Sequence, residues 1–386
     1  MAVYCFTFCT GQDPAPILPS REDNTAGDKP RSDITTPGDE GNPEVSEGKS
    51  IYVCAILQKE DGSKELALYR DGSQELSVKC SEENHISEDA DSHFLIGSRL
   101  FTAFTGRDGT HIGMNGKILC SWEQREYVKS LLWDGSDVWT LGLHLEEKGF
   151  CVRKNGIPFF TKKDGTPLSF YFDASDLYLS YYTLLADKRI TYLVKNDNEA
   201  AIKGPNSLEV EDVLIHNGRT CIIERDTDRF LMNYAGKELS LDCQAGFKII
   251  NAEAIPYGQE DFTLILHMKS NYAPMPADKI CNKDTTILVG AGTACHYCFD
   301  DTSWWRLCLT KDADKWYIYN GATDTENILN DIYLPSERCA TIEDGALYLA
   351  ASYKDTSRHP FVWTDGKTLT YRITGTLTGI SVSPPM

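Results

Sequence analysis

The sequence predicts an all-β chain assembled from a repeated unit, because two independent markers recur with the same period. The first marker is an aromatic residue, replaced once by cysteine, that opens an alternating apolar and polar run about every 42 residues. It stands at Tyr52, Phe101, Trp139, Tyr178, Cys221, Phe262, Trp305 and Tyr348. Alternation with a period of two indicates a β-strand with one buried face, so each copy contributes at least one strand.

The second marker is a tight turn that follows each run in phase with the first marker. It stands at Gly72, Gly116, Gly156, Gly236, Gly321 and Gly366, with "KNDN" and "CNKD" in the fourth and sixth copies. Asn-Gly and Asp-Gly favour the positive φ angles of a two-residue hairpin, since glycine has no Cβ to clash. Each unit is therefore expected to contain a hairpin at this position.

A further strand-like segment lies between successive copies, as in "HFLIGS" and "PLSFYFDAS", and helical periodicity is nearly absent. Four short strands in about 42 residues are typical of a β-propeller blade. Sandwiches and up-and-down barrels do not repeat at this period. Residues 51–386 provide room for eight such blades, and seven is the alternative because the sixth copy is the weakest.

The two ends of the repeat region predict how the ring closes. The first copy, from Ile51, lacks a leading strand, while the last copy is followed by an extra one, "TLTGISVS" at 376–383. Pairing this strand into the first blade would remove two exposed sheet edges. We therefore expect a propeller over residues 50–386 whose ring is closed by the C-terminal strand.

Residues 1–49 differ from the rest of the chain. Between Thr10 and Lys49, Pro, Gly, Ser, Thr and acidic residues dominate, which predicts a disordered polar tether. The apolar start, "MAVYCFTFC", has the character of a signal remnant. A cysteine before a polar tether is typical of bacterial lipoproteins, with Cys9 as the lipidated residue, although Phe8 stands where a small residue is usual. A soluble protein without this anchor is the alternative.

Charge and composition limit the partners. The 57 acidic and 38 basic residues give a net charge of −19, which repels nucleic acid and anionic lipid headgroups. No apolar run reaches the ~18 residues of a membrane-spanning helix, so membrane attachment is expected only through the N-terminal lipid. The 13 cysteines are scattered mostly as single residues, which indicates core positions rather than a disulfide framework. We expect a monomer without a cofactor.

The repeat residues resemble those of uncharacterised bacteroidete surface lipoproteins with a repeat-built β-propeller domain, whose blades read roughly "DVYVAGY…YWKNG…LTDG". Here the pattern stands as "DVWTLGL…CVRKNG…TKKDG" and "ALYLAAS…FVWTDG…YRITG". The resemblance covers residues 51–386 and concerns blade geometry rather than chemistry. It implies a propeller of the bacterial cell envelope, in the outer membrane or periplasm, whose ligand is unknown.

A propeller has two faces that differ in their loops. The first-to-second and third-to-fourth turns lie on the tight-turn face, while the second-to-third loops and the blade crossings lie on the crossover face. Variable loops mark the crossover face as the functional one, and segments 79–93 and 121–127 are among its richest. The candidate ligand-binding residues, each of which could also be an ordinary loop residue, are Trp122, Arg125, Tyr272, His296, Tyr297, Arg358 and His359.

Motifs for metal or redox chemistry are weak. Cys295 and Cys298 form the only Cys-x-x-Cys pair. A redox role needs a helix N-terminus to lower the thiol pKa, and structural zinc needs two further ligands. Core or loop cysteines are therefore the favoured interpretation, with a metal site or a disulfide left open. No catalytic or metal-ligating residue is assigned.

These observations favour a non-enzymatic propeller of the cell envelope that binds a glycan or a protein ligand through its crossover face. The alternative is a propeller enzyme acting on polysaccharide, a lyase or a glycoside hydrolase. Such an enzyme needs a carboxylate pair, or His with Arg or Tyr, at the mouth of the central channel. A purely structural role is the third possibility.

Overall fold

The computed structural model describes residues 31–32 and 48–383, apart from short stretches in the second half of the chain. These stretches are 205–207, 217, 227–228, 235–236, 243–246, 258–260, 271–275, 282–285, 290–293, 300–302, 310–314, 322, 324, 335–336 and 356–357. Between 234 and 297 the description covers the backbone of the strands.

The described residues form eight sheets, each built on four antiparallel strands. The first contains β34 (Gly375–Ser383), β2 (Ser50–Gln58), β3 (Lys64–Arg70) and β4 (Ser73–Lys79). The second contains β5 (His93–Ile96), β6 (Arg99–Thr105), β7 (Thr110–Met114) and β8 (Lys117–Trp122). The third contains β9 (Glu126–Trp133), β10 (Val138–His144), β11 (Gly149–Lys154) and β12 (Ile157–Lys163). The fourth contains β13 (Thr166–Asp173), β14 (Asp176–Leu185), β15 (Lys188–Lys195) and β16 (Asn198–Lys203).

The other four sheets follow the same plan. The fifth contains β17 (Glu209–His216), β18 (Arg219–Asp226), β19 (Arg229–Tyr234) and β20 (Lys237–Asp242). The sixth contains β21 (Phe247–Tyr257), β22 (Asp261–Ser270), β23 (Pro276–Cys281) and β24 (Thr286–Val289). The seventh contains β25 (Ala294–Phe299), β26 (Trp304–Leu309), β27 (Lys315–Asn320) and β28 (Thr325–Asn330). In the eighth sheet, β29 (Ile332–Tyr333) and β30 (Ala340–Glu343) both pair with β31 (Ala346–Tyr353). Strand β31 pairs in turn with β32 (Phe361–Thr364), and β32 pairs with β33 (Lys367–Thr370).

Three short elements complete the description. Strand β1 (Arg31–Ser32), from the segment expected to be a tether, pairs in parallel with β28. Two 3₁₀ turns, η1 (Ala90–Ser92) and η2 (Glu337–Cys339), precede the inner strands β5 and β30. In the described part of the chain, no helix has the length and apolar character needed to cross a membrane.

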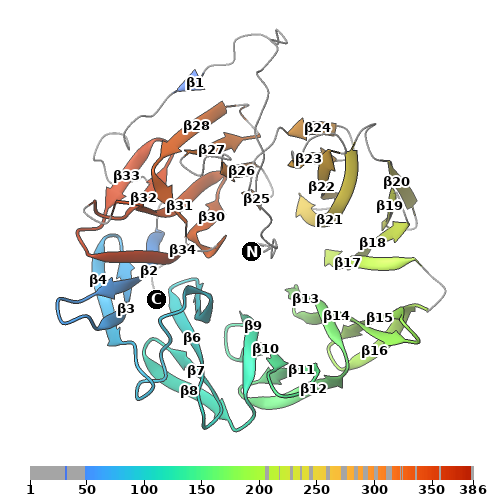
Figure 1. The fold of residues 1–386 in the computed structure, drawn as a ribbon, viewed down its shortest axis with the longest axis horizontal. Helices are drawn as coiled ribbons and strands as arrows, with labels where there is room; N and C mark the ends of the chain where they lie inside the picture. The colour runs from blue at the N-terminus through green and yellow to red at the C-terminus, as the bar shows by residue number, and fades with distance from the viewer. Residues whose placement is uncertain are drawn as a thin grey trace.

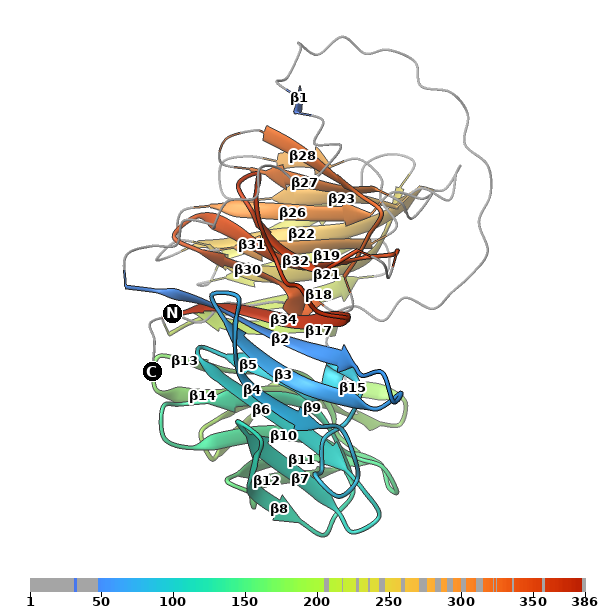
Figure 2. The ribbon, with the colours of Figure 1, turned by 90° about the vertical axis from the view of Figure 1, so that its left-hand side faces the viewer.

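The eight sheets are arranged around a common centre, with β9, β13 and β17 on the inner side and β8, β12 and β16 on the outer side of their sheets (Figure 1). The C-terminal strand β34 pairs with β2 from Ser50 to Leu57. Each sheet contacts the next, including the eighth with the first through β31 and β34. Figure 2 shows this junction from the side, where β34 in red lies beside β2 in blue. The fold is therefore the predicted eight-bladed β-propeller, with the C-terminal strand completing the first blade.

The predicted hairpins join the third and fourth strands of the blades. Asp71 and Gly72, at φ of 46° and 81°, show the two positive φ angles of a two-residue turn. Gly321 departs from this prediction, because its φ is not positive and residues 321–324 separate β27 from β28. A Cβ at this position would lie 1.8 Å from Cε2 of Trp304, so the close approach of the indole explains this glycine.

The core lies between neighbouring sheets, which explains the aromatic marker. Tyr52 packs between the first and second sheets, Trp139 between the third and fourth, and Trp305 between the seventh and eighth. Burying each such side chain stabilises the fold by about 1.5–3 kcal/mol. The marker thus recurs once per blade because each sheet buries apolar side chains against its neighbour.

Candidate functional site

A cavity of about 200 Å³ opens on the crossover face above the second and third blades. Segment 79–93, which crosses from β4 to β5, contributes Ser87, Asp89 and Ser92. The opposite wall comes from residues 103–105 of β6, from Tyr127 and Val128 of β9, and from Leu145 after β10. The cavity therefore joins two segments, 79–93 and 121–127, that the sequence marked as rich functional loops.

Local hydrogen bonds hold the crossing segment in place. Oδ1 of Asp89 accepts from the N–H of Asp91 at 3.1 Å and caps the 3₁₀ turn η1, while Oγ of Ser87 accepts from the N–H of Asp89 at 3.0 Å. A carboxylate at this position satisfies a backbone donor that the turn leaves without an intrahelical partner. Arg338 of η2 donates to the carbonyls of Asp91 and His93, both at 2.8 Å, and so ties the segment to the eighth blade.

The lining combines acceptors on one side with apolar surface on the other. Ser87, Asp89 and Ser92 provide hydroxyl and carboxylate oxygens. Tyr127 and Leu145, which are 45% and 51% exposed, provide aromatic and aliphatic surface at the rim. Pockets that enclose a drug-sized molecule are larger, at about 300–1,000 Å³, so this cavity fits one unit of a longer ligand.

A buried ion pair lies beneath this face. Glu126, fully buried at the start of β9, accepts from Nε and Nη2 of Arg153 at 3.1 and 2.8 Å. Its N–H donates to Oγ1 of Thr110 at 2.9 Å, which joins the third blade to the second. Gly142 leaves room for the carboxylate, since a Cβ there would lie 2.3 Å from Oε2 of Glu126. The pair is therefore a rigid support for the loops above it.

Two of the predicted site residues belong to segment 121–127, which reaches the cavity at Tyr127. Trp122 ends β8 and is half-buried, and the guanidinium of Arg153 covers its ring at 4.8 Å from the centroid. Arg125 is exposed, and its Nε donates to the carbonyl of Gly106 at 3.0 Å. Its carbonyl accepts from the N–H of Leu145 at 3.2 Å, which places Arg125 beside the rim. A role of both residues in ligand binding stays a prediction.

The remaining predicted residues lie on other blades. Arg358, between β31 and β32, stacks on the ring of Tyr353 at 3.5 Å. Nδ1 of His359 lies 3.1 Å from the carbonyl oxygen of Ile373. Both residues are on the crossover face but belong to the eighth blade, so they form a group separate from the cavity. Tyr272 and Cys9 lie outside the described residues, as do the side chains of His296 and Tyr297.

The Cys-x-x-Cys pair lies within strand β25 rather than in a loop. Cys298 is buried with Trp305, Leu307 and Trp316 in the core between the seventh and eighth blades. This environment agrees with the interpretation of a core cysteine. The side chain of Cys295 lies outside the described residues.

Sequence analysis did not single out Tyr127, Leu145 or the histidines near the cavity. Leu145 carried a signal, because it is an apolar residue within the charged loop "HLEEKG". Among the described residues, one cluster has donors suited to a metal ion, and it consists of His85, Asp108 and His111. These three residues span 26 positions and match no known metal-binding spacing, so their proximity could be found only in the folded chain.

Comparison with known proteins shows the fold alone. No protein-family profile matches the chain, and no curated protein matches its sequence. Among solved structures, a prolyl endopeptidase aligns with a TM-score of 0.51 at 11% identity, over 83% of this chain and 55% of that one. The β-propeller domain of the Trilobed protease from Pyrococcus furiosus aligns with a TM-score of 0.44 at 9% identity, over 74% and 92%. A eukaryotic initiation factor aligns with a TM-score of 0.46 at 10% identity, over 88% and 100%.

The chain therefore spans about half the length of the prolyl endopeptidase that it resembles, at 55% of that chain. The eight sheets of the described residues, each built on four antiparallel strands around a common centre, define the β-propeller fold. At 11% identity this likeness carries no statement about activity.

Proposed function

We propose that this protein is a binding propeller that recognises one neutral sugar unit of a glycan in the cavity of the crossover face. The observation that carries the proposal is the meeting of segments 79–93 and 121–127 around a space of about 200 Å³. Sugar hydroxyls donate to carboxylate and hydroxyl oxygens, here those of Asp89, Ser87 and Ser92, while the apolar face of a sugar ring packs on an aromatic ring such as that of Tyr127. The net charge of −19 disfavours an anionic glycan.

Two further points support binding rather than catalysis. Glu126, the carboxylate beneath the cavity, is fully buried and paired with Arg153, so it does not reach a bound substrate. This chain aligns with only 55% of the prolyl endopeptidase. A shared propeller fold does not by itself imply a shared reaction, because many unrelated functions occur on the same fold. A polysaccharide lyase or glycoside hydrolase is therefore the less favoured alternative.

The experiment is a glycan array with the purified protein, followed by affinity measurements on variants. Tyr127→Ala and Asp89→Asn should each weaken binding by about 1–3 kcal/mol, as anchor residues commonly do. Asn at position 89 can still cap η1, so this variant tests the carboxylate and not the loop fold. Phe159→Ala is the matched control, because Phe159 is an aromatic residue of similar exposure, 38%, near the tight turn of the third blade.

Loss of binding in Phe159→Ala equal to that in Tyr127→Ala would contradict the assignment of the face. If no glycan binds, the sugar proposal fails, and a pull-down from envelope extract with wild type and Tyr127→Ala then tests a protein ligand. We also propose the envelope location, which the sequence resemblance implies, and a lipid at Cys9, which a cysteine between an apolar start and a polar tether indicates. Incorporation of a labelled fatty acid into wild type but not into Cys9→Ser tests them.

A further inference from the structure

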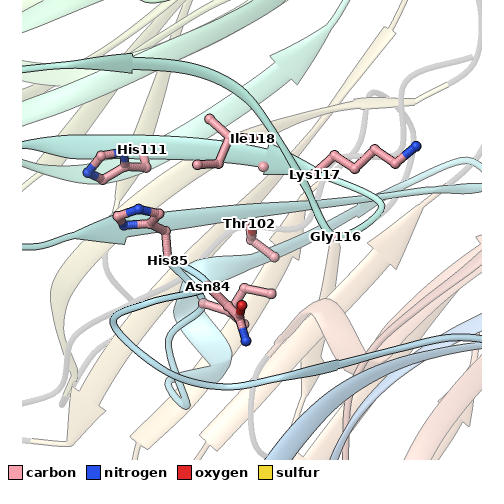
Figure 3. A pocket seen from close by; sticks show the side chains of 9 residues that line it. Asn84, His85, Thr102, His111, Gly116, Lys117 and Ile118 are labelled. Carbon is pink, nitrogen blue, oxygen red and sulfur yellow. The ribbon is translucent and has the colours of Figure 1, made fainter.

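Two stacked histidine rings lie next to Phe104, which also lines the cavity. His85 comes from segment 79–93 and His111 from the start of β7, and their ring centroids are 3.9 Å apart with an interplanar angle of 22° (Figure 3). Oδ2 of Asp108, in the loop between β6 and β7, lies 3.2 Å from Nε2 of His111. One ligand atom from each of the three residues lies within 4.8 Å of the others.

The loop that carries His85 is held in a single conformation. An isolated bridge joins Ser81 to Ile86, and the side-chain amide of Asn84 donates to the carbonyl of Lys79 at 3.0 Å. His85 itself has a φ of 51°, a conformation that non-glycine residues adopt uncommonly. Backbone strain of this kind is often found at ligand sites, where the surrounding structure maintains it.

Each of the two imidazoles has one buried nitrogen without a hydrogen-bond partner among the described residues. His111 is 8% exposed, and its Nε2 faces Oδ2 of Asp108 at 3.2 Å, whereas its Nδ1 is buried without a hydrogen-bond partner in the part of the chain that the structure describes. Within the same part of the chain, Nδ1 of His85 is also buried without a partner. A buried polar atom left in this way costs about 1–3 kcal/mol, so these two nitrogens require an explanation. A bound cation would take one nitrogen from each imidazole as a ligand.

We propose that His85, Asp108 and His111 form a binding site for a divalent transition-metal ion of the zinc type. Two imidazoles and one carboxylate match the donors of three-ligand zinc sites, whereas Mg²⁺ and Ca²⁺ prefer oxygen alone. Metal–ligand bonds of about 2.0–2.2 Å place neighbouring ligand atoms of a tetrahedral ion roughly 3.3 Å apart, close to the 3.2 Å found between Asp108 and His111. The ligand atom of His85 lies within 4.8 Å of the other two, so its stacked ring must turn towards the ion when the ion binds.

The surroundings leave room for the ion. Beside the two histidines is a space of about 10 Å³, lined also by Asn84 and Thr102 and large enough for roughly one water molecule (Figure 3). The side chain of Asp108 is 65% exposed, which provides a path from solvent. Three protein ligands leave the fourth position of the ion to water or to a ligand. Binding would also fasten segment 79–93 to the second blade.

The test uses the full chain, freed of metal by dialysis against chelator and titrated with Zn²⁺ by calorimetry. We expect one Zn²⁺ per chain, and at least tenfold weaker binding in His85→Ala and in Asp108→Asn. Zn²⁺ should raise the melting temperature of the wild type but not of these variants, since a ligand of the native state stabilises it. Both substitutions lie in loops, so they test the site without disturbing β7. His359→Ala, a histidine on the same face, should bind as the wild type does.

The 13 cysteines require a second measurement that separates thiolate from nitrogen and oxygen ligands. Bound Co²⁺ should show no sulfur-to-cobalt charge-transfer band. Such a band, unchanged Zn²⁺ affinity in His85→Ala and Asp108→Asn, or equal affinity for Mg²⁺ would each overturn the proposal. The outcome does not depend on glycan binding, because metal affinity is measured on the protein alone.

Discussion

The side chain of Asn115 substitutes for a backbone partner of Leu100. Oδ1 of Asn115 accepts from the N–H of Leu100 at 2.9 Å, and the N–H of Asn115 donates to the carbonyl of Leu100 at 2.8 Å. The same pair of bonds joins Asp71 to Ile51, with both distances at 2.9 Å. In these two blades, the first residue of the tight turn after the third strand is thus hydrogen-bonded to a residue at the start of the second strand.

Substitutions at Asn115 should separate this side-chain bond from the conformational demand of the turn. Asn115→Asp should be nearly neutral, because Asp71 makes the same bonds in the first blade. Asn115→Gly keeps the positive φ but leaves the buried N–H of Leu100 unpaired, at a cost of about 1–3 kcal/mol. Asn115→Ala should cost about 1 kcal/mol more, because alanine also resists positive φ. Urea unfolding measures this order, and a Gly variant as stable as wild type would contradict it.

These turns show how far the sequence could predict the fold. Asn115 and Gly116 predicted a hairpin through their φ preferences, and the 42-residue spacing of such turns predicted the blades. The bond from Leu100 to Asn115 was not predictable, because the partners are 15 residues apart and meet only after β6 and β7 pair. The conformation of a turn depends on neighbouring residues and can be predicted from them. The hydrogen-bond partner of a side chain depends on which strands pack together.

The candidate site follows the same division. Segments 79–93 and 121–127 were predicted from loop composition and blade order, and they meet at the cavity. The contact between His85 and His111 depends on the turn of one loop over another strand. The cover of Trp122 by Arg153 depends on two blades packing together. Repeat sequences specify which face carries the loops, but not which side chains converge there.

The buried pair of Glu126 and Arg153 should be far more sensitive to loss of one partner than to loss of both. Arg153→Met leaves the Glu126 carboxylate buried without its counter-ion and should cost about 3–5 kcal/mol. The double variant Glu126→Gln with Arg153→Met removes both charges and should be more stable than Arg153→Met alone. The free energies of unfolding in urea give this double-mutant cycle. Additive single effects would mean that the two charges act independently.

Stability should fall in mild acid because of His93. Its ring is buried, and burial lowers its pKa to about 4, with the nearby charge of Arg338 acting in the same direction. The hydrogen bond to the carbonyl of Ser87 and the charge of Asp89 oppose this shift. The unfolded chain, with a histidine pKa of about 6.5, then binds more protons than the native state between these values, so stability rises with pH across this window.

The contribution of His93 is therefore fully present above about pH 6.5, and up to roughly 3 kcal/mol is lost as the pH falls towards 4. His93→Gln cannot take up this proton, so its unfolding free energy should depend less on pH in the same range. Urea midpoints of both proteins at several pH values measure the difference. Other titrating groups are common to both proteins and cancel, so parallel pH profiles would exclude His93 as the cause.

The closing strand should matter far more than the N-terminal segment. β34 pairs with β2 over its length and buries Leu377 and Ile380 in the core between the first and eighth blades. Deletion of 376–386 removes this packing and exposes the edge of β2, which favours association between chains. Leu377→Ala, a milder change at a fully buried position, should cost about 2–5 kcal/mol. Deletion of residues 1–48 removes the two-residue pairing of β1 with β28 but leaves the pair of Lys49 with Glu343 in place, so it should change the melting temperature little.

Thermal unfolding and light scattering of the two truncated proteins and Leu377→Ala compare these effects directly. The C-terminal truncation should unfold at a much lower temperature and aggregate, because an opened ring loses contacts on both sides of the junction between β31 and β34. Leu377→Ala should fall between this truncation and the wild type, since it weakens the strand without removing its backbone pairing. If both truncations melted together, near the wild type, β34 would contribute nothing to closure, and the first blade would be stable with three strands.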